Sequence, residues 1–356
     1  MAQKMMEYLK EQPAVWGKIV KEREEIFREL KEYGIRPVKR ILLIGSGSSN
    51  IASMAAADFM ENILGIETTA AVPTRLNGFR KVLKPEDTLV IASSQSGKST
   101  STISAVKEWR EHGFTVITAT SDPKSPVALH GSMHQLIPCG EEAVGPKTKG
   151  MTGTVLTLSL MGLILGQLWN RVEEGQFHHF LDEINKSIEA APFNIEASME
   201  FCKRNEDLLS SMPHFTLISE EAGYYAAQEG ALKILETLYV PAAAYEFEEY
   251  LHGINNTIEP GMCNLFLPAG THNSDRMAVL ERYSREKGCI NFVITSLDWE
   301  RGSHVLNLTG SREPYFSMFQ ALLAFQVMSV YGSERKCIEC DTPKFHDFYQ
   351  VMNTKA

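Results

Sequence analysis

Apolar positions along this chain follow two patterns, one with helical spacing and one of short continuous runs. Over residues 8–33 apolar side chains recur at helical spacing, which predicts an amphipathic helix that ends at Gly34. Farther along, short apolar runs of the buried-strand type alternate with helical stretches, as a parallel α/β sheet requires. In the first half these runs lie at 40–44, 68–72, 88–92, 115–119 and 134–138.

The second half repeats this order. Apolar runs lie at 215–218, 264–268, 291–295 and 304–308, and a long apolar helix closes each half, at 152–170 and 315–331. We therefore predict an α/β fold of two tandem units related by duplication, each a parallel sheet between two helical layers. The predicted boundaries are an N-terminal helical arm at 1–34, a first unit at 35–171, a helical connector at 172–204, a second unit at 205–345 and a C-terminal tail at 346–356.

Composition narrows the class of protein. The 356 residues exceed one typical core, and the net charge of -9 argues against a nucleic-acid partner. The apolar runs are shorter than a bilayer span, and the N-terminus lacks the apolar core of a signal peptide. Six scattered cysteines suit a reducing compartment, so a cytoplasmic location is expected. Cys337 and Cys340 form a CxxC without a second pair, which is a weak signal for a metal or redox site.

Two loops have the composition of anion-binding turns. The sequence GSGSS follows the first strand, and SSQSGKST, ending at Thr100, follows the strand at 88–92. Each loop opens a helix, where backbone N–H groups, hydroxyls and the helix dipole attract an anion. The Walker spacing is absent, which favours a phosphomonoester over a nucleoside triphosphate. An ordinary serine-rich turn remains the alternative.

A third loop, EEAVGPKTKGMTGT, leads into the long apolar helix of the first half. Lys147 and Lys149 bring positive charge, while Gly145 and Gly150 let the backbone approach a ligand. The alternative is a basic loop that offsets the charge of an acidic protein, and the sequence favours neither interpretation.

A cluster of ionisable residues lies in the second half. Glu229, Lys233 and Glu236 share one face of a predicted helix, and His252 follows on a loop beside Gly253. A carboxylate and an imidazole make an acid/base pair. The alternative is a solvated helix face followed by an ordinary loop histidine.

These residues resemble the sugar isomerase (SIS) superfamily of tandem phosphosugar-binding domains. The closest patterns are the isomerase half of glucosamine-6-phosphate synthase and the fructosamine- and glucoselysine-6-phosphate deglycases. The resemblance covers nearly the whole chain, and its most specific motifs are GSGSS, SSQSGKS, PKTKGMT, EGALKILE and LHG. It implies two SIS-type units, no cofactor and no metal. It also implies a homodimer or larger homo-oligomer whose active sites lie between subunits.

The resemblance also implies a role for individual residues. Glu236 matches the carboxylate that transfers a proton between C1 and C2, Glu229 matches the first glutamate of the motif, and His252 matches the ring-opening histidine. The implied substrate-binding residues are Gly47, Ser48, Ser49, Ser94, Gln95, Ser96, Ser99, Gly145 and Lys233.

Three positions depart from the family pattern. Lys98 replaces an acidic residue of the phosphate loop, and SEEAG at 219–223 replaces a more glycine-rich turn. The lysine with which the synthase forms a Schiff base is replaced by Phe348, and Lys344 lies out of register. Together with the lack of a glutaminase domain in this sequence, that replacement argues against an amidotransferase.

The resemblance therefore implies an enzyme that hydrolyses a fructosyl- or glucosyl-amino acid 6-phosphate to hexose 6-phosphate and the free amino acid, with lysine as the leading candidate. The same residues would serve an aldose-ketose isomerase or an amino-sugar-phosphate deaminase. A non-catalytic sugar-phosphate sensor is a third alternative, against which stand Glu236, His252, the acidic charge and the lack of a helix-turn-helix in this sequence. The sequence leaves open which amine is released and whether it is attached at C1 or C2.

Overall fold

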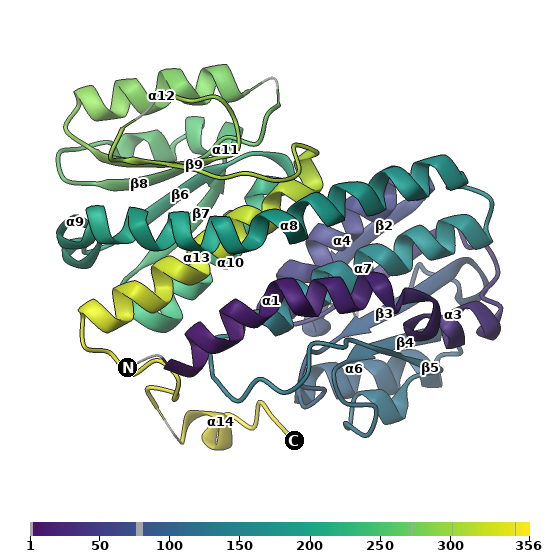
Figure 1. Cartoon of the computed structure of the whole chain (residues 1–356). Helices are drawn as coiled ribbons and strands as arrows, with labels where there is room; N and C mark the ends of the chain where they lie inside the picture. Colours follow the sequence, from purple (N-terminus) through teal and green to yellow (C-terminus); the bar gives the residue numbers. More distant parts are fainter. Residues whose placement is uncertain (1–2, 76–80, 272, 301, 346) are drawn as a thin grey trace. The chain divides into compact units, whose positions relative to one another are not determined.

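The computed structural model describes residues 3–75, 81–271, 273–300, 302–345 and 347–356 (Figure 1). These residues divide into two compact units, which we describe separately. The first unit contains residues 14–142, 149–181 and 344–356, and the second contains residues 1–13, 143–148 and 182–343. Residue 346, where the predicted tail begins, lies outside the described residues.

The first unit is built on a five-stranded parallel sheet with the order β2-β1-β3-β4-β5. Parallel neighbours need crossover connections, and helices supply those between β1 and β2 and between β3 and β4. The strands are β1 (Arg40–Ile44), β2 (Glu67–Ala71), β3 (Thr88–Ser93), β4 (Thr115–Thr120) and β5 (Met133–Leu136), and the main helices are α4 (Ser48–Leu64), α6 (Thr100–Glu111) and α7 (Lys149–Leu168).

The second unit repeats this architecture, with the strand order β10-β9-β8-β6-β7. Read from the opposite edge, β6 takes the place of β1 and β8 takes the place of β3. The strands are β6 (Phe215–Ser219), β7 (Ala242–Glu246), β8 (Cys263–Leu267), β9 (Ile290–Thr295) and β10 (Val305–Asn307). The helices are α9 (Glu206–Ser211), α10 (Glu221–Leu238), α11 (Phe247–Leu251), α12 (Ser274–Glu286) and α13 (Pro314–Arg335). The predicted fold of two parallel α/β units is thus confirmed.

Local boundaries differ from the prediction in two places. The N-terminal arm is divided into α1 (Gln3–Lys21), α2 (Arg23–Ile26) and α3 (Arg28–Tyr33), and Gly34 ends it in the left-handed conformation with φ of 68°. Strand β7 was not predicted, because its sequence AAAYE carries no period-2 alternation and all its residues are only half-buried. The predicted connector is the single helix α8 (Glu174–Arg204).

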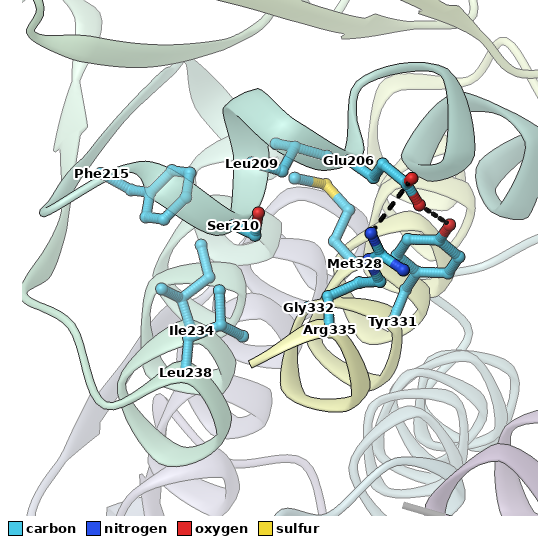
Figure 2. Close-up of a pocket in the computed structure, with 10 residues that line it drawn as sticks. All are labelled: Glu206, Leu209, Ser210, Phe215, Ile234, Leu238, Met328, Tyr331, Gly332 and Arg335. Atoms are coloured by element: carbon cyan, nitrogen blue, oxygen red, sulfur yellow. Dashed lines mark hydrogen bonds and ion pairs between the residues drawn. The ribbon is translucent and has the colours of Figure 1, made fainter. Parts of the chain in front are cut away.

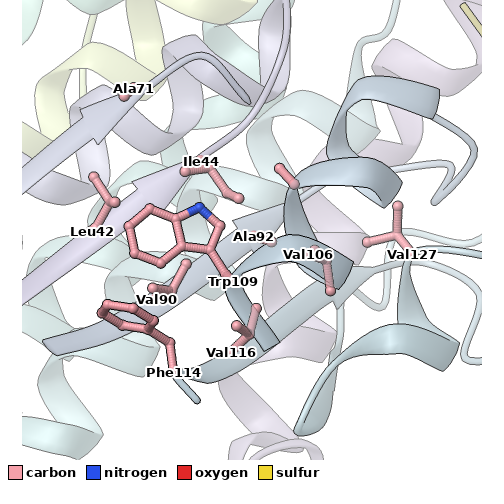
Figure 3. Packing of buried hydrophobic residues seen from close by; sticks show 11 residues of the cluster. Leu42, Ile44, Ala71, Val90, Ala92, Val106, Trp109, Phe114, Val116 and Val127 are labelled. Carbon is pink, nitrogen blue, oxygen red and sulfur yellow. The ribbon is translucent and has the colours of Figure 1, made fainter. Parts of the chain in front are cut away.

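The core of the first unit forms between the sheet and α6. Trp109 is fully buried there and meets the ring of Phe114 edge to face, with ring centroids 4.5 Å apart (Figure 3). Side chains of β1, β3 and β4 surround this pair. This packing holds α6 against the sheet, and α6 begins directly after the serine-rich loop at the end of β3.

Helix α7 is long and apolar enough to cross a membrane by length and composition. However, 89% of its apolar window is buried inside the protein, and α4 packs along it. Its apolar character is therefore explained as that of a core helix.

We expect Trp109→Ala to lower the free energy of unfolding by about 3–5 kcal/mol, because it removes a large side chain from a packed core. The measurement is urea denaturation followed by circular dichroism. Leu129→Ala is the control, because Leu129 is 70% exposed and its removal should change the unfolding free energy by no more than about 0.5 kcal/mol. Equal effects of the two substitutions would contradict the assignment of Trp109 to the core.

Candidate functional site

The two serine-rich loops of the first unit meet at the carboxyl ends of β1 and β3. Gly47 has φ of 57° and precedes α4, so Ser48 and Ser49 lie in the first turn of that helix. The backbone N–H of Gln95 lies 3.5 Å from Ser49 Oγ, and Ser93 Oγ donates to the Ser49 carbonyl at 3.1 Å. The structure thus brings the predicted sugar-contacting and phosphate-binding loops together.

The second loop makes a tight turn that only glycine fits. Gly97 has φ of 65°, and a Cβ there would lie 2.0 Å from Ser125 Oγ. Its N–H donates to the Ser94 carbonyl at 2.8 Å, which closes the turn. Ser99 then caps α6, because its Oγ accepts from the N–H of Thr102 at 3.4 Å. Hydroxyls and the N-terminus of α6 are therefore arranged as an anion-binding turn requires.

A cluster of buried polar groups holds the side chain of Gln95 in place. Gln95 Nε2 donates to Cys139 Sγ at 3.6 Å, and burial raises the pKa of the Cys139 thiol, so the thiol stays neutral. The N–H of Gly150 donates to Glu142 Oε2 at 2.9 Å, and a Cβ at Gly150 would lie 2.8 Å from Gln95 Cγ. Gln95 is consequently held in one position, with only 8% of its surface exposed.

The lysine-containing loop is divided between the units. Lys149 and Gly150 belong to the first unit, whereas Gly145 and Lys147 belong to the second. The Gly145 N–H donates to the Asp341 carbonyl at 3.4 Å, and Lys147 Nζ donates to the Val144 carbonyl at 2.9 Å. Gly145 remains a predicted substrate contact.

In the second unit, a glutamate side chain of the protein itself lies where the two loops equivalent to the serine-rich loops meet. Glu220, 1% exposed, follows β6, and its carboxylate accepts from the N–H of Ala269 at 3.3 Å, from Ser274 Oγ at 2.9 Å and from Thr271 Oγ1. All three donors follow β8, the counterpart of β3. The position of a bound anion in the duplicated fold is thus filled by Glu220, which favours the first unit as the phosphate site.

The predicted acid/base helix is α10, and its three ionisable residues form one cluster. Lys233 Nζ lies 3.1 Å from Glu229 Oε1 and 2.5 Å from Glu236 Oε2. The side chains of Lys233 and Glu229 are fully buried, whereas that of Glu236 is 35% exposed. Glu236 is therefore the carboxylate of this cluster that solvent or a ligand reaches.

Electrostatics keep this cluster charged. Burial alone would lower the pKa of Lys233, but the charges of Glu229 and Glu236 and their hydrogen bonds outweigh it and raise that pKa above its ordinary value. The ammonium holds the Glu236 carboxylate at one position while its exposed edge faces outward. A positioned carboxylate of this kind is suited to take and return a proton.

His252 lies at the end of α11, on the surface of the second unit. Its Nδ1 is 2.7 Å from the Glu248 carbonyl oxygen, so the Nδ1–H tautomer donates there and leaves Nε2 to accept a proton. Its hydrogen bond is to the backbone of its own helix and not to the cluster on α10.

An apolar pocket of the second unit lies on the face of α10 opposite the ion cluster. Phe215, Ile234 and Leu238 line it, and Glu206 bonds to Tyr331 Oη and Arg335 at its rim (Figure 2). Its cavity volume of about 10 Å³ is no larger than one water molecule needs, which argues against a substrate site there.

The CxxC also shows no metal or redox arrangement. Cys337 is exposed and Cys340 is buried, and both are free thiols. Cys340 Sγ lies 3.4 Å from Ser333 Oγ. Among the residues that the structure describes, no group of three or more His, Cys, Asp or Glu side chains is arranged to hold a metal ion.

One feature of the serine-rich loop was not predicted from the sequence. Residues 353–356 pair with it: the N–H of Thr100 donates to the Thr354 carbonyl at 3.2 Å, and the N–H of Ala356 donates to the Lys98 carbonyl at 2.9 Å. A strand of so few residues leaves no periodic signal, so the pattern of the tail gave no indication of it.

Comparison with known proteins agrees with this geometry. Residues 34–165 match the SIS domain. Glutamine--fructose-6-phosphate aminotransferase [isomerizing] of Lactococcus lactis subsp. lactis (strain IL1403) is 24% identical, over 96% of this chain and 57% of its own length. The chain thus spans little more than half of that relative.

Solved structures agree over a still larger share of the chain. A protein of Clostridium difficile 630, to which phosphosugar isomerase activity is ascribed, superposes with a TM-score of 0.91, at 25% identity and 99% coverage of both chains. A Salmonella typhimurium LT2 protein described as sugar-binding gives a TM-score of 0.80 at 27% identity, over 91% of this chain and 98% of its own.

Residues 34–165 of the chain are therefore a SIS domain. The chain as a whole is similar to the isomerase part of the aminotransferases and to a solved structure described as a phosphosugar isomerase, which confirms the resemblance seen in the sequence. The roles of individual residues stay predictions.

We expect Lys233→Met to destabilise the protein by about 3–5 kcal/mol at neutral pH, because it leaves the buried Glu229 carboxylate without its cation. Lys18→Met is the control, because the side chains of Lys18 and Glu22 are 57% and 50% exposed in their ion pair. Urea denaturation measures both. A loss no larger than that of the control would contradict a structural role for the cluster.

The same ion pair predicts a pH dependence. Because the folded-state pKa of Lys233 lies above its ordinary value of 10.5, its stabilising contribution is present below pH 10.5 and is lost as the pH rises through the folded-state value. The difference in unfolding free energy between wild type and Lys233→Met should therefore not shrink between pH 7 and about pH 10, and it should shrink at higher pH. A difference that already shrinks between pH 7 and about pH 9 would contradict the raised pKa.

Proposed function

We propose that this protein is a sugar-phosphate amine deglycase. The substrate is a fructosyl- or glucosyl-amino acid 6-phosphate of the fructoselysine or glucoselysine type, and the products are hexose 6-phosphate and the free amino acid. The observation that carries the proposal is the Glu236 carboxylate, part-exposed and bonded to a fully buried ammonium. Such a group moves a proton between adjacent carbons without a change in its own position.

The phosphate is held by the serine-rich loop of the first unit. Hydroxyls of Ser94, Ser96 and Ser99 donate to its oxygens, together with the backbone N–H of Gln95 and the dipole of α6. Gly47, Ser48, Ser49 and Gly145 contact the sugar. Binding energy from the phosphate, remote from the reacting carbons, positions those carbons for proton transfer.

The chemistry is a proton shift followed by hydrolysis. His252 assists opening of the sugar ring. Glu236 removes the proton from the carbon of the C1–C2 pair that bears the amine, giving an enaminol, and returns a proton to the other carbon, so that the amine-bearing carbon becomes an imine carbon. Water adds to that imine and the amine leaves, which completes the hydrolysis. Glu229 is fully buried against Lys233, and we assign it the role of holding that ammonium in place.

Phe348 argues against an amidotransferase reaction. It stands where the synthase-like pattern has its Schiff-base lysine, and its side chain is 52% exposed at the start of α14 (Phe348–Val351). A phenylalanine forms no imine with a ketose.

The second candidate is an aldose-ketose isomerase or an amino-sugar-phosphate deaminase. The names of the relatives favour it, since both the aminotransferase and the Clostridium protein are described as isomerising. These reactions run through the same enediol or enaminol and need the same carboxylate. We further propose a cytoplasmic homodimer that binds no nucleic acid.

Fructoselysine 6-phosphate and glucoselysine 6-phosphate, supplied separately, test the proposal. We expect release of lysine from one of them, and the hexose 6-phosphate formed identifies the direction of the proton shift. If neither lysine adduct is cleaved but glucosamine 6-phosphate or a plain hexose 6-phosphate is converted, the deglycase proposal is wrong and the second candidate function is supported. Binding without turnover of any of them would indicate a sensor.

We expect Glu236→Gln to lower kcat by at least about 10³-fold while Kd for the substrate stays nearly unchanged, because the amide cannot carry the proton. Stopped assays of lysine release and calorimetric titration measure the two quantities. Glu286→Gln, which removes an exposed carboxylate from α12, is the matched control. Loss of binding together with turnover would mean that Glu236 is structural.

Mixed dimers test whether His252 acts in the neighbouring subunit. Glu236→Gln chains and His252→Asn chains, each inactive alone, are co-expressed. If the histidine is supplied across the interface, each mixed dimer contains one intact site, and random pairing restores about a quarter of wild-type activity. If His252 serves its own subunit, the mixture stays inactive. Two tags on the two chains allow the mixed dimer to be isolated and its activity measured directly.

A further inference from the structure

The C-terminal residues form a short antiparallel pair with the serine-rich loop of the first unit. Thr100 donates its N–H to the Thr354 carbonyl at 3.2 Å and its Oγ1 hydroxyl to the Asn353 carbonyl at 2.8 Å. The N–H of Ala356 donates to the Lys98 carbonyl at 2.9 Å. Between these bonds, Ser99 and Lys355 are directly opposite each other.

This bonding pattern determines where the Lys355 side chain points. The backbone hydrogen bonds lie on either side of Ser99 and Lys355 and do not connect these two residues to each other. Ser99 and Lys355 are therefore a non-hydrogen-bonded antiparallel pair. Side chains of such a pair lie on the same face, with Cα atoms about 4.5 Å apart. The Lys355 side chain therefore lies on the face of the Ser99 hydroxyl.

Local structure in the tail holds this arrangement. After α14, Asn353 adopts the left-handed conformation with φ of 48°, which asparagine tolerates better than most residues, and the chain reverses there. The N–H of Thr354 donates back to the Tyr349 carbonyl at 3.2 Å. Lys355 Nζ lies 4.1 Å from the centroid of the Tyr349 ring, so the cation is held over an aromatic face.

The charges at this end of α6 favour a bound anion. Ser99 caps α6, and the N-terminus of that helix carries a partial positive charge. Lys98 and Lys355 add two exposed ammonium groups to the two strands of the pair at that end. A dianion bound between the helix N-terminus and Lys355 would be attracted by all of these charges.

We infer that Lys355 is a further substrate-binding residue, which the paired tail places beside Ser99 to contact the phosphate of the phosphosugar. The inference rests on the proposed phosphate site and names a residue that neither the motif pattern nor the family's tail lysine assigns. The tail acts as a clamp: its backbone bonds to Lys98 and Thr100 place the charge, and the ammonium binds the phosphate.

The test measures Kd for glucose 6-phosphate and fructose 6-phosphate by calorimetric titration. We expect Lys355→Met to weaken binding about tenfold, the low end for loss of a charge-assisted hydrogen bond at an exposed site. Lys355→Arg keeps the charge and should restore most of the affinity. Lys344→Met removes a tail lysine that lies over the Phe345 ring instead, and should leave Kd unchanged. Added salt should shrink the difference between wild type and Lys355→Met.

A second variant separates the charge from its placement. Thr100→Pro removes the N–H and the hydroxyl that bind the tail, but it keeps Lys355. The variant should fold, because proline is favoured at the first position of a helix and Ser99 already has the extended conformation that precedes proline. We expect Thr100→Pro to weaken hexose 6-phosphate binding as much as Lys355→Met does, and the double variant to bind no more weakly than either single variant. Independent, additive losses would overturn the clamp.

The outcomes distinguish this inference from the proposed function. If wild type binds neither hexose 6-phosphate, the phosphate site and the inference fail together. If wild type binds them and Lys355→Met binds equally well, the inference alone is wrong. Tighter binding by Lys355→Met or Thr100→Pro would overturn it in favour of a tail that obstructs the loop.

Discussion

The chemistry proposed for the second unit depends on one buried ion cluster. Lys233 is fully buried and charged, and it remains so only because Glu229 and Glu236 lie within ion-pair distance on the same helix. Burying an ammonium is costly, and two carboxylates offset that cost. Since one of them keeps an exposed edge, the arrangement that stabilises the charge also presents a carboxylate for proton transfer. The geometry of the reaction is thus tied to the stability of α10.

The two units share one architecture, and a few side chains make them different. In both, two loops meet at the carboxyl ends of neighbouring central strands, the usual ligand position in open α/β sheets. In the first unit these loops carry serines and a glycine turn. In the second, the Glu220 carboxylate accepts the hydrogen bonds of the loop after β8. A built-in anion in one unit and an open anion-binding turn in the other divide the roles between them.

The pairing of the tail with the serine-rich loop connects residues more than 250 positions apart. Its few hydrogen bonds use the backbone, so almost any sequence would form them once the tail reaches the loop. What is specific is the lysine at the middle position and the asparagine that reverses the chain before it. The proposed phosphate site is therefore composed of a loop that the motif defines and a tail that the motif does not.

The sequence by itself determined the parallel α/β units, their duplication and the SIS motifs, because buried strands, helical periodicity and glycine-serine turns are local patterns. It also placed Glu229, Lys233 and Glu236 on one helix face, since their spacing fixes this. Only the tertiary structure decided that Lys233 is fully buried, that Glu220 fills the second unit's anion position and that residues 353–356 pair with the loop at Thr100. Burial and long-range pairing depend on which elements pack together, and the spacing of residues along one chain does not contain that information.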